Sequence, residues 1–555
     1  METREAPERL PHERLLLAAV LLVALASRLL RFDRVAVLFN DGPVFLAIAE
    51  RLAAGDLRTA LAHPFHPLYP AAIAFAHALL APFGVGLERA AAVASAVAGT
   101  GAVLAVHAFA RRAFDARIAV VAAALLAFHA HLVETSGDVQ SEGLYLALFL
   151  GALAALWRAL DEGRLRSALA AGALAGLSYL TRPEGLGVAA VGVALAGFGL
   201  ATGRWPGRRR VAAAALLAAG TALVAAPYVL WLSLDEGTLA LTRKKSVSWV
   251  AGVPGAQGEP GGLATGQPGM EAPKRELRPA ERAAAAGHLA AALRASGAAP
   301  KTLPAPDDPR FDALVAPPWT ARSAGAALLD LLGTARRALR PEFLVLLVAG
   351  LVAVRGRPGP RAGFVGALLA FHAAILFALA MNVGYVSSRH LLPPLAPLVA
   401  YAAVGVLALA DLASRGVPAR RRAVAAGLVG LVAAICVGKS LLQVDQRGEL
   451  AERRAAEWAS QRLPAGAAVA ARKRRVAYYA GAPFVQLRPK RPEGFARYFD
   501  GHGVRYVIVN ASDVPEYVGL APLVGLLLRE VHRVEAEGET AIVWAWDGAA
   551  PGEAP

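Results

Sequence analysis

The amino-acid sequence predicts a polytopic α-helical membrane protein that ends in a small soluble α/β domain. Of its 555 residues, 56% are hydrophobic and 18% are charged, against about 25% charged residues in a typical soluble protein. One soluble core cannot bury that much apolar surface, which excludes a soluble, disordered or fibrous chain. The lone Cys436 also excludes a disulfide framework and a cysteine-based metal site.

Eleven segments are apolar enough to be transmembrane helices, each of which needs about 17–25 residues. They are Leu15–Leu30, Ala90–Ala110, Ile118–Val133, Gly143–Trp157, Ser167–Leu180, Gly185–Ala201, Val211–Leu232, Phe343–Val354, Ala362–Met381, Leu391–Ala410 and Ala423–Leu441. The first lacks a convincing cleavage site, and we interpret it as a retained anchor and not as a signal peptide.

Lys and Arg alternate between the connecting loops, and this alternation predicts the orientation. Five loops are rich in arginine, around residues 111–117, 158–166, 204–210, 355–361 and 415–422, whereas the intervening turns are nearly free of basic residues. The N-terminus and these five loops are therefore expected in the cytoplasm of a bacterial inner (plasma) membrane, with an external C-terminus. The net charge of +16 is mainly this topology signal, and we expect no nucleic-acid partner.

The predicted membrane domain covers residues 1–444, and its two long external loops break the pattern of spans. The first loop, residues 32–87, contains the apolar run Pro67–Phe83, which we interpret as an interfacial helix because a span there would invert every later basic loop. The second, residues 233–340, has a centre rich in Gly, Pro and Ala and ends in the amphipathic surface helix Trp319–Arg340.

Residues 445–555 form the predicted external α/β domain, of about 110 residues. Gly503–Val509 and Thr540–Trp546 have the residues of strands, whereas Leu450–Arg462 and Tyr517–Val531 have the patterns of helices.

Acidic residues gather at the predicted external boundary of the membrane. Asp41 follows the first span, and Glu134, Asp138 and Glu142 lie between the third and fourth spans. A half-sheltered carboxylate can act as a general base, because partial desolvation raises its pKa toward the working pH. Alternatively, Asp41 is an interfacial turn residue, Glu134 and Asp138 are solvated loop charges, and Glu142 is a charge that favours its helix dipole.

Basic residues on the same side are candidates for binding a lipid phosphate. They are Arg243, Lys244 and Lys245 after the seventh span, and Arg389 with His390 before the tenth. Alternatively, the run from Arg243 to Lys245 is a solvated patch on a loop, and Arg389 is an anchor at the membrane edge. The turn residues Arg182 and Glu184 are candidate substrate contacts or a structural ion pair, and His66 is a candidate groove residue.

Seven short motifs, in order along the chain, resemble the GT-C membrane glycosyltransferases. The similarity is to the branch of protein O-mannosyltransferases, aminoarabinose transferases and Rgt-type lipopolysaccharide transferases (glycosyltransferase family 39-like). The motifs are Arg28–Arg31 followed by Asp41, AERLAAGD (Ala49–Asp56), HPLY (His66–Tyr69), AFARRAFDA (Ala108–Ala116), SEGLY (Ser141–Tyr145), GLSYLTRPEG (Gly176–Gly185) and SRHLLP (Ser388–Pro393).

This resemblance implies an external active site that takes a hexose or pentose from a polyprenyl phosphate and transfers it to a lipid, glycan or protein. The resemblance implies that Asp41 activates the acceptor and that Glu142 corresponds to the acidic residue of the second external loop. Many relatives have a second acid or a tyrosine directly after the first acid, whereas this chain has Gly42-Pro43-Val44 after Asp41. The candidate substrate-binding residues are then His66, Tyr69, Asp138, Arg182, Glu184, Lys244, Lys245, Arg389 and His390.

No cofactor is expected, because the sequence has no phosphate-binding or dinucleotide-binding motif and no HExxH zinc motif. No cluster of metal ligands is evident either, so we expect a metal-independent reaction.

Two other classes of function stay open at this point. A lipid-sugar transporter or flippase predicts charges near the middle of the bilayer and broken helices in repeated halves. A non-enzymatic envelope-assembly protein would give Asp41 and Glu142 no reason to converge.

Overall fold

The structure is a computed structural model. It describes residues 10–198, 207–243, 323–355, 360–383, 386–415, 417–440, 449–487, 492–517, 520, 523–525 and 527–547. The chain divides into two compact units. Unit 1 contains the apolar helices, and unit 2 contains the described residues after Glu449 together with Val35–Val44, the segment that includes Asp41.

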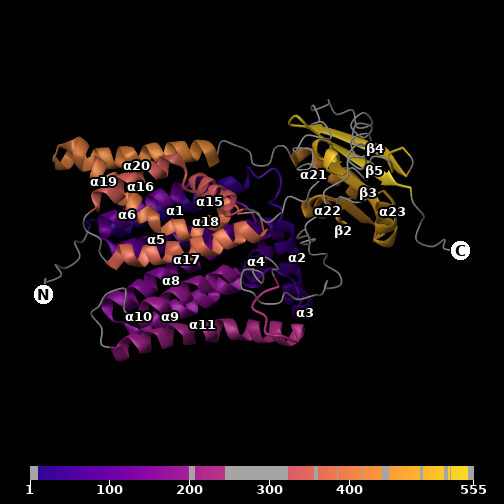
Figure 1. The fold of residues 1–555 in the computed structure, drawn as a ribbon. Helices are drawn as coiled ribbons and strands as arrows, with labels where there is room; N and C mark the ends of the chain where they lie inside the picture. Colours follow the sequence, from indigo (N-terminus) through magenta and orange to yellow (C-terminus); the bar gives the residue numbers. More distant parts are fainter. Residues whose placement is uncertain are drawn as a thin grey trace. The chain divides into compact units, whose positions relative to one another are not determined.

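The membrane part is helical throughout (Figure 1). Its helices are α1 (Glu13–Phe32), α2 (Gly42–Ala53), α3 (Leu57–Leu61), α4 (Leu68–Leu80), α5 (Leu87–Ala113), α6 (Ala116–Phe128), α7 (Ala130–Ser136), α8 (Glu142–Glu162), α9 (Leu165–Thr181), α10 (Leu186–Phe198), α11 (Gly207–Glu236), α15 (Ala324–Leu339), α16 (Pro341–Ala353), α17 (Pro360–Val383), α18 (Ser388–Leu395), α19 (Val399–Ser414) and α20 (Pro418–Ser440). Short 3₁₀ turns follow α4, α9 and α18: η1 (Ala81–Phe83), η2 (Pro183–Gly185) and η3 (Ala396–Leu398).

The predicted class, a polytopic α-helical membrane protein with a small C-terminal sheet domain, is confirmed. Within the described residues, 7 helices are long and apolar enough to cross a membrane, or up to 8 if the bent pair α6–α7 counts as one span. Helices occupy all eleven predicted segments where these are described, although the third is interrupted at His129, α9 has 17 residues, and α10 and α16 have 13 each. Eleven spans therefore remain a prediction.

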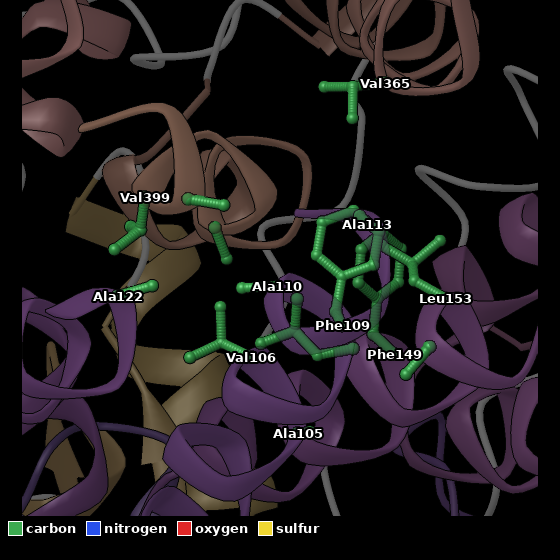
Figure 2. Packing of buried hydrophobic residues seen from close by; sticks show 14 of the residues in the cluster. Ala105, Val106, Phe109, Ala110, Ala113, Ala122, Phe149, Leu153, Val365 and Val399 are labelled. Carbon is green, nitrogen blue, oxygen red and sulfur yellow. The ribbon is translucent and has the colours of Figure 1, made fainter. Parts of the chain in front are cut away.

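The core of unit 1 is built from interlocked small and aromatic side chains. Figure 2 labels Phe109 of α5, Phe149 of α8, Val365 of α17 and Val399 of α19, which belong to one buried cluster. Lipid supplies no hydrophobic force between helices, so close backbone approach has to stabilise the bundle. A Cβ at Gly350 would overlap the carbonyl oxygen of Tyr401, and this contact brings α16 directly onto α19.

The third predicted span is broken, and a buried arginine satisfies the break. α6 and α7 meet at an angle of 60°. Arg28 of α1 is fully buried; its Nη1 donates to the carbonyl oxygens of Ala24 (2.8 Å) and Ala127 (3.2 Å), and its Nε donates to Ser136 Oγ (2.9 Å). A kink frees backbone carbonyls that water cannot reach in a bilayer, so a neighbouring donor has to satisfy them.

Unit 2 contains a mixed five-stranded sheet in the order β2-β1-β3-β5-β4. The strands are β1 (Ala468–Ala471), β2 (Phe484–Gln486), β3 (Val504–Asn510), β4 (Leu528–Ala536) and β5 (Glu539–Trp546), and the helices are α21 (Leu450–Ser460), α22 (Arg474–Tyr479), α23 (Pro492–Gly501) and the 3₁₀ turn η5 (Ala511–Glu516). β1 pairs in parallel with β2 and β3, whereas β5 is antiparallel to β3 and β4. α21 and α22 share one core with the sheet, and α23 and η5 share another.

The structure confirms five of the predicted surface and C-terminal elements and corrects one. The helix at Pro67–Phe83, the described part of the amphipathic helix before Arg340, the helix after Leu450 and the two strands are present. The helix predicted over Tyr517–Val531 is wrong, because β4 begins at Leu528. A hairpin turn at Glu537 and Gly538, both at positive φ, pairs β4 with β5, and this pairing overrides the local helical pattern.

A half-buried glutamate, Glu449, and a buried one, Glu452, lie at the start of α21. Glu449 binds Lys473 and, at 2.9 Å, Arg475. Burial raises the pKa of Glu449, but the hydrogen bond to Glu452 and the two cations outweigh this effect and lower the pKa to about 2. Burial and the neighbouring Glu449 carboxylate raise the pKa of Glu452 to about 8. The pair therefore keeps a proton on Glu452 at neutral pH.

The pair predicts that unit 2 loses stability as the pH rises. The folded chain retains the Glu452 proton up to about pH 8, whereas an unfolded glutamate releases it near pH 4.5. The free energy of unfolding should therefore fall by roughly 1 kcal/mol per pH unit between about pH 5.5 and 7.5. Pulse proteolysis in urea of the full chain in detergent measures it. Glu452→Gln should remove this slope and the exposed control Glu535→Gln should keep it; equal slopes in all three proteins would refute the assignment.

Candidate active site

Glu142 joins three segments that are far apart in the sequence. It is the first residue of α8 and is 3% exposed. Its Oε1 accepts a hydrogen bond from Arg182 Nη1 at 2.7 Å and from Arg389 Nη1 at 3.2 Å. Two guanidinium groups on one carboxylate hold it in the ionised form, and they also compensate its burial. Three predicted site residues are thus in direct contact.

A pocket opens beside this ion-pair cluster. It is lined by Tyr145, Arg182, Glu184, His372, Arg389 and His390, with Ile375, Leu376 and Pro393 as its apolar side, and its cavity volume is about 20 Å³. The Arg182 guanidinium also lies 3.6 Å from Glu184 and over the ring of Tyr145. Charged groups therefore line one side of this small cavity and apolar groups line the other.

Asp138 is buried, which excludes the solvated-loop alternative for it. It is 2% exposed, and its carboxylate accepts hydrogen bonds from its neighbours, Val139 N–H at 2.6 Å and Gln140 Nε2 at 3.3 Å. Glu134, one turn before it, lies 3.3 Å from His131 Nδ1. Asp138 therefore fixes the turn that precedes Glu142.

His66 and Tyr69 fix the start of α4 to neighbouring helices. His66 Nδ1 lies 2.6 Å from the carbonyl oxygen of Tyr179, and its Nε2 lies 3.1 Å from Thr242 Oγ1. The Tyr69 hydroxyl lies 2.7 Å from Ser95 Oγ of α5. Both side chains are 1% exposed. In this structure they support the first loop, and their predicted contact with substrate remains a prediction.

A second, strongly basic pocket was not predicted from the sequence. Arg336, Arg337, Arg340, Lys439 and His131 line it with Pro341 and Ser388, and its cavity volume is about 380 Å³. Glu342 lies 3.4 Å from the Arg340 guanidinium and 3.2 Å from Lys439 Nζ. Among the described residues, neither Arg336 nor Arg337 has an acidic partner, so cationic charge is left for an anionic ligand.

These two pockets flank the beginning of α18. Ser388 lines the basic pocket, and the next two residues, Arg389 and His390, line the other. The amphipathic pattern of residues 319–340 predicts a membrane-surface helix, but pattern alone does not say that arginines in its last turn share a pocket with Lys439. Only the fold reveals this grouping.

The remaining predicted residues lie elsewhere. Asp41 is half-buried in unit 2, in the turn that leads into α2, where Gly42 N–H donates to the Phe39 carbonyl oxygen at 2.8 Å. Arg243 forms ion pairs with Asp235 and Glu236. Lys244 and Lys245 lie outside the described residues.

The arrangement of the helices is similar to the fold of solved glycosyltransferases. The family model described as dolichyl-phosphate-mannose-protein mannosyltransferase matches residues 62–231. This range includes Glu142 and Arg182, and the match confirms the resemblance seen in the motifs. No curated protein sequence matches the chain.

Solved structures with the same fold are glycosyltransferases. ArnT from Cupriavidus metallidurans, bound to undecaprenyl phosphate, is 14% identical, with 96% of this chain and 97% of that chain covered and a TM-score of 0.57. The oligosaccharyltransferase of Archaeoglobus fulgidus is 15% identical, with 89% and 68% covered and a TM-score of 0.56. A structure of that archaeal enzyme with an inhibitory peptide and a dolichol-phosphate is 14% identical, with 90% and 69% covered and a TM-score of 0.53.

The Glu142 cluster predicts a large and specific loss of stability. Glu142→Gln removes the carboxylate shared by the buried Arg182 and the half-buried Arg389, which should cost about 3–5 kcal/mol. Thermal denaturation of the purified protein in detergent measures it. The matched control Glu184→Gln, which removes a longer and more exposed ion pair with Arg182, should cost about 1 kcal/mol or less. Equal losses for the two variants would show that Glu142 does not hold the cluster together.

Proposed function

We propose that this protein is a membrane glycosyltransferase that takes a sugar from a polyprenyl-phosphate donor and transfers it to a hydroxyl acceptor. The observation that carries the proposal is the basic pocket beside the membrane-surface helix α15, in a chain with the GT-C fold. A lipid phosphate is an anion that reaches the protein at the membrane surface, so its site needs cationic donors at that depth.

The donor phosphate is placed in the basic pocket. Arg336 and Arg337 supply cationic charge that no described acid neutralises, whereas Arg389 is already hydrogen-bonded to Glu142. The N-terminus of α18, at Ser388, adds the favourable end of a helix dipole to the same pocket. The polyprenyl chain would follow the apolar faces of the interfacial helices.

Asp41 is the proposed general base. Its carboxylate accepts the proton of the acceptor hydroxyl; the acceptor oxygen then bonds to the anomeric carbon while the bond from that carbon to the phosphate oxygen breaks. The cations of the basic pocket stabilise the charge that develops on the leaving phosphate. The phosphate ester already activates the sugar, so we propose that no organic cofactor takes part.

Glu142 holds the site together in this proposal. A carboxylate bound by two guanidinium groups is a weak base, which favours Asp41 for proton abstraction. Glu142 instead fixes the positions of Arg182 and Arg389, next to the basic pocket that is proposed to bind the donor phosphate.

We further propose that the chain lies in a bacterial inner membrane with the N-terminus cytoplasmic and unit 2 external. The alternation of arginine-rich and arginine-poor loops supports this orientation. The acceptor is then a glycan, lipid or protein on the external side. A flippase or an assembly protein has the weaker support, because the matching family model and the solved structures are those of glycosyltransferases.

The function is tested by incubating the purified full chain with a panel of radiolabelled polyprenyl-phosphate sugars and envelope acceptors. Transfer from at least one donor is expected. Asp41→Asn keeps the shape of the side chain and should lower turnover by roughly 10²–10⁴-fold, because it removes the base. The control Asp33→Asn, which changes an exposed acid paired with Arg89, should keep wild-type turnover. Full activity in Asp41→Asn would remove Asp41 from the mechanism.

The phosphate site predicts a change in donor affinity. Arg337→Ala should raise the KM for the donor about tenfold or more, and Arg337→Lys should raise it less, because lysine keeps the charge but loses the fork of donors. The exposed Arg420→Ala serves as a control and should leave KM unchanged. An unchanged donor KM in Arg337→Ala, measured by initial-rate kinetics, would place the phosphate elsewhere.

A further inference from the structure

The segment that carries Asp41 is part of the same compact unit as the C-terminal domain. Residues Val35–Val44 belong to unit 2, although about 400 residues of chain separate them from β1. The side chains of Val37 and Leu38 are 1% and 2% exposed. This part of the first loop is therefore packed as a segment of the domain.

Three side chains of the domain hold the segment by its backbone. Arg453 Nη1 donates to the carbonyl oxygen of Ala36 at 2.7 Å, and Arg475 Nη1 donates to that of Leu38 at 3.2 Å. In the other direction, the Leu38 N–H donates to the Tyr479 hydroxyl at 3.0 Å. Leu38 therefore has both its donor and its acceptor satisfied by α22, three residues before Asp41.

The holding side chains are themselves held in place. The Arg453 guanidinium lies over the Tyr479 ring at 4.6 Å, and it also binds Glu457 at 2.8 Å. Arg475 is 4% exposed and is anchored by Glu449 at 2.9 Å. A donor that is preorganised in this way loses little conformational entropy when it binds a backbone carbonyl.

The charge of Asp41 acts on the same helix. Burial lowers the pKa of Arg474 to about 10, and the Asp41 carboxylate opposes that shift. Arg474 is the first residue of α22, and Tyr479 is its last. One short helix thus carries a backbone contact to Leu38, through Arg475 and Tyr479, and an electrostatic contact to Asp41.

We infer that the C-terminal domain positions the candidate general base, with Arg453, Arg475 and Tyr479 acting as positioning residues that fix Asp41 through the backbone of Ala36 and Leu38. This inference rests on the proposed function of Asp41. A displacement of about 1 Å can cost on the order of 100-fold in turnover, so contacts three to five residues from a catalytic group are close enough to control it.

The test uses the full chain with Tyr479→Phe, which removes one hydroxyl, and Arg453→Met. Each should lower kcat about tenfold or more at unchanged donor KM, because alignment of the base is lost and donor binding is not. Arg453→Lys should recover part of the loss, since lysine can still donate to the Ala36 carbonyl. The control Arg462→Met removes a comparable arginine that contacts Trp458 and not the segment, and it should match wild type.

A second readout is independent of activity. Hydrogen–deuterium exchange followed by mass spectrometry should show faster exchange of the peptide covering 36–41 in Tyr479→Phe, and wild-type exchange in Arg462→Met. In the Asp41→Asn background, Tyr479→Phe should reduce the residual kcat no further, because there is no base left to align.

Three outcomes would overturn the inference: unchanged exchange of the 36–41 peptide, faster exchange with unchanged kcat, or a rise in donor KM at unchanged kcat. The last would assign the segment to substrate binding. If wild type transferred no sugar from any donor, the proposed function would fail, and the exchange measurement would still decide whether the domain holds the segment.

Discussion

One buried carboxylate oxygen, Oε1 of Glu142, determines how the candidate site residues of unit 1 are arranged. It binds guanidinium groups from the turn after α9 and from the beginning of α18. A buried charge is tolerated only when such partners are close and well oriented. The need to compensate Glu142 therefore fixes α8, the Arg182 turn and α18 relative to one another, and with them the two pockets that flank α18.

The bilayer imposes a related constraint on the helices behind this site. A broken span exposes carbonyl groups that lipid cannot hydrate. The α6–α7 break is tolerated because Arg28 reaches the Ala127 carbonyl and Ser136 from α1. Gly99 allows this, since a Cβ at that position would overlap Ser136 and the Arg28 guanidinium. The short helix α7 then leads into the turn that contains Asp138, and this turn places Glu142 next to Arg182 and Arg389.

The sequence was sufficient for the fold class, because apolar length and loop charge are local properties of a membrane protein. It was sufficient to name Glu142, Arg182 and Arg389, because charges at a membrane boundary are few. It could not group Arg336 and Arg337 with Lys439, which depends on how α15, α16 and α20 pack. Nor could it find β4, where pairing with β5 outweighs the helical pattern of 517–531.

The attachment of the Asp41 segment is hidden from the sequence for a further physical reason. Arg453, Arg475 and Tyr479 bind the carbonyl groups of Ala36 and Leu38 and the N–H of Leu38, and every residue except proline offers these groups. Such contacts constrain the path of the chain but not the identity of the residues that are held, so the first loop carries no motif for them. The constraint lies in the conformation of 36–41 and in three side chains more than 400 residues further along the chain. A C-terminal domain can in this way fix a distant segment of the chain, although the two sequences look unrelated.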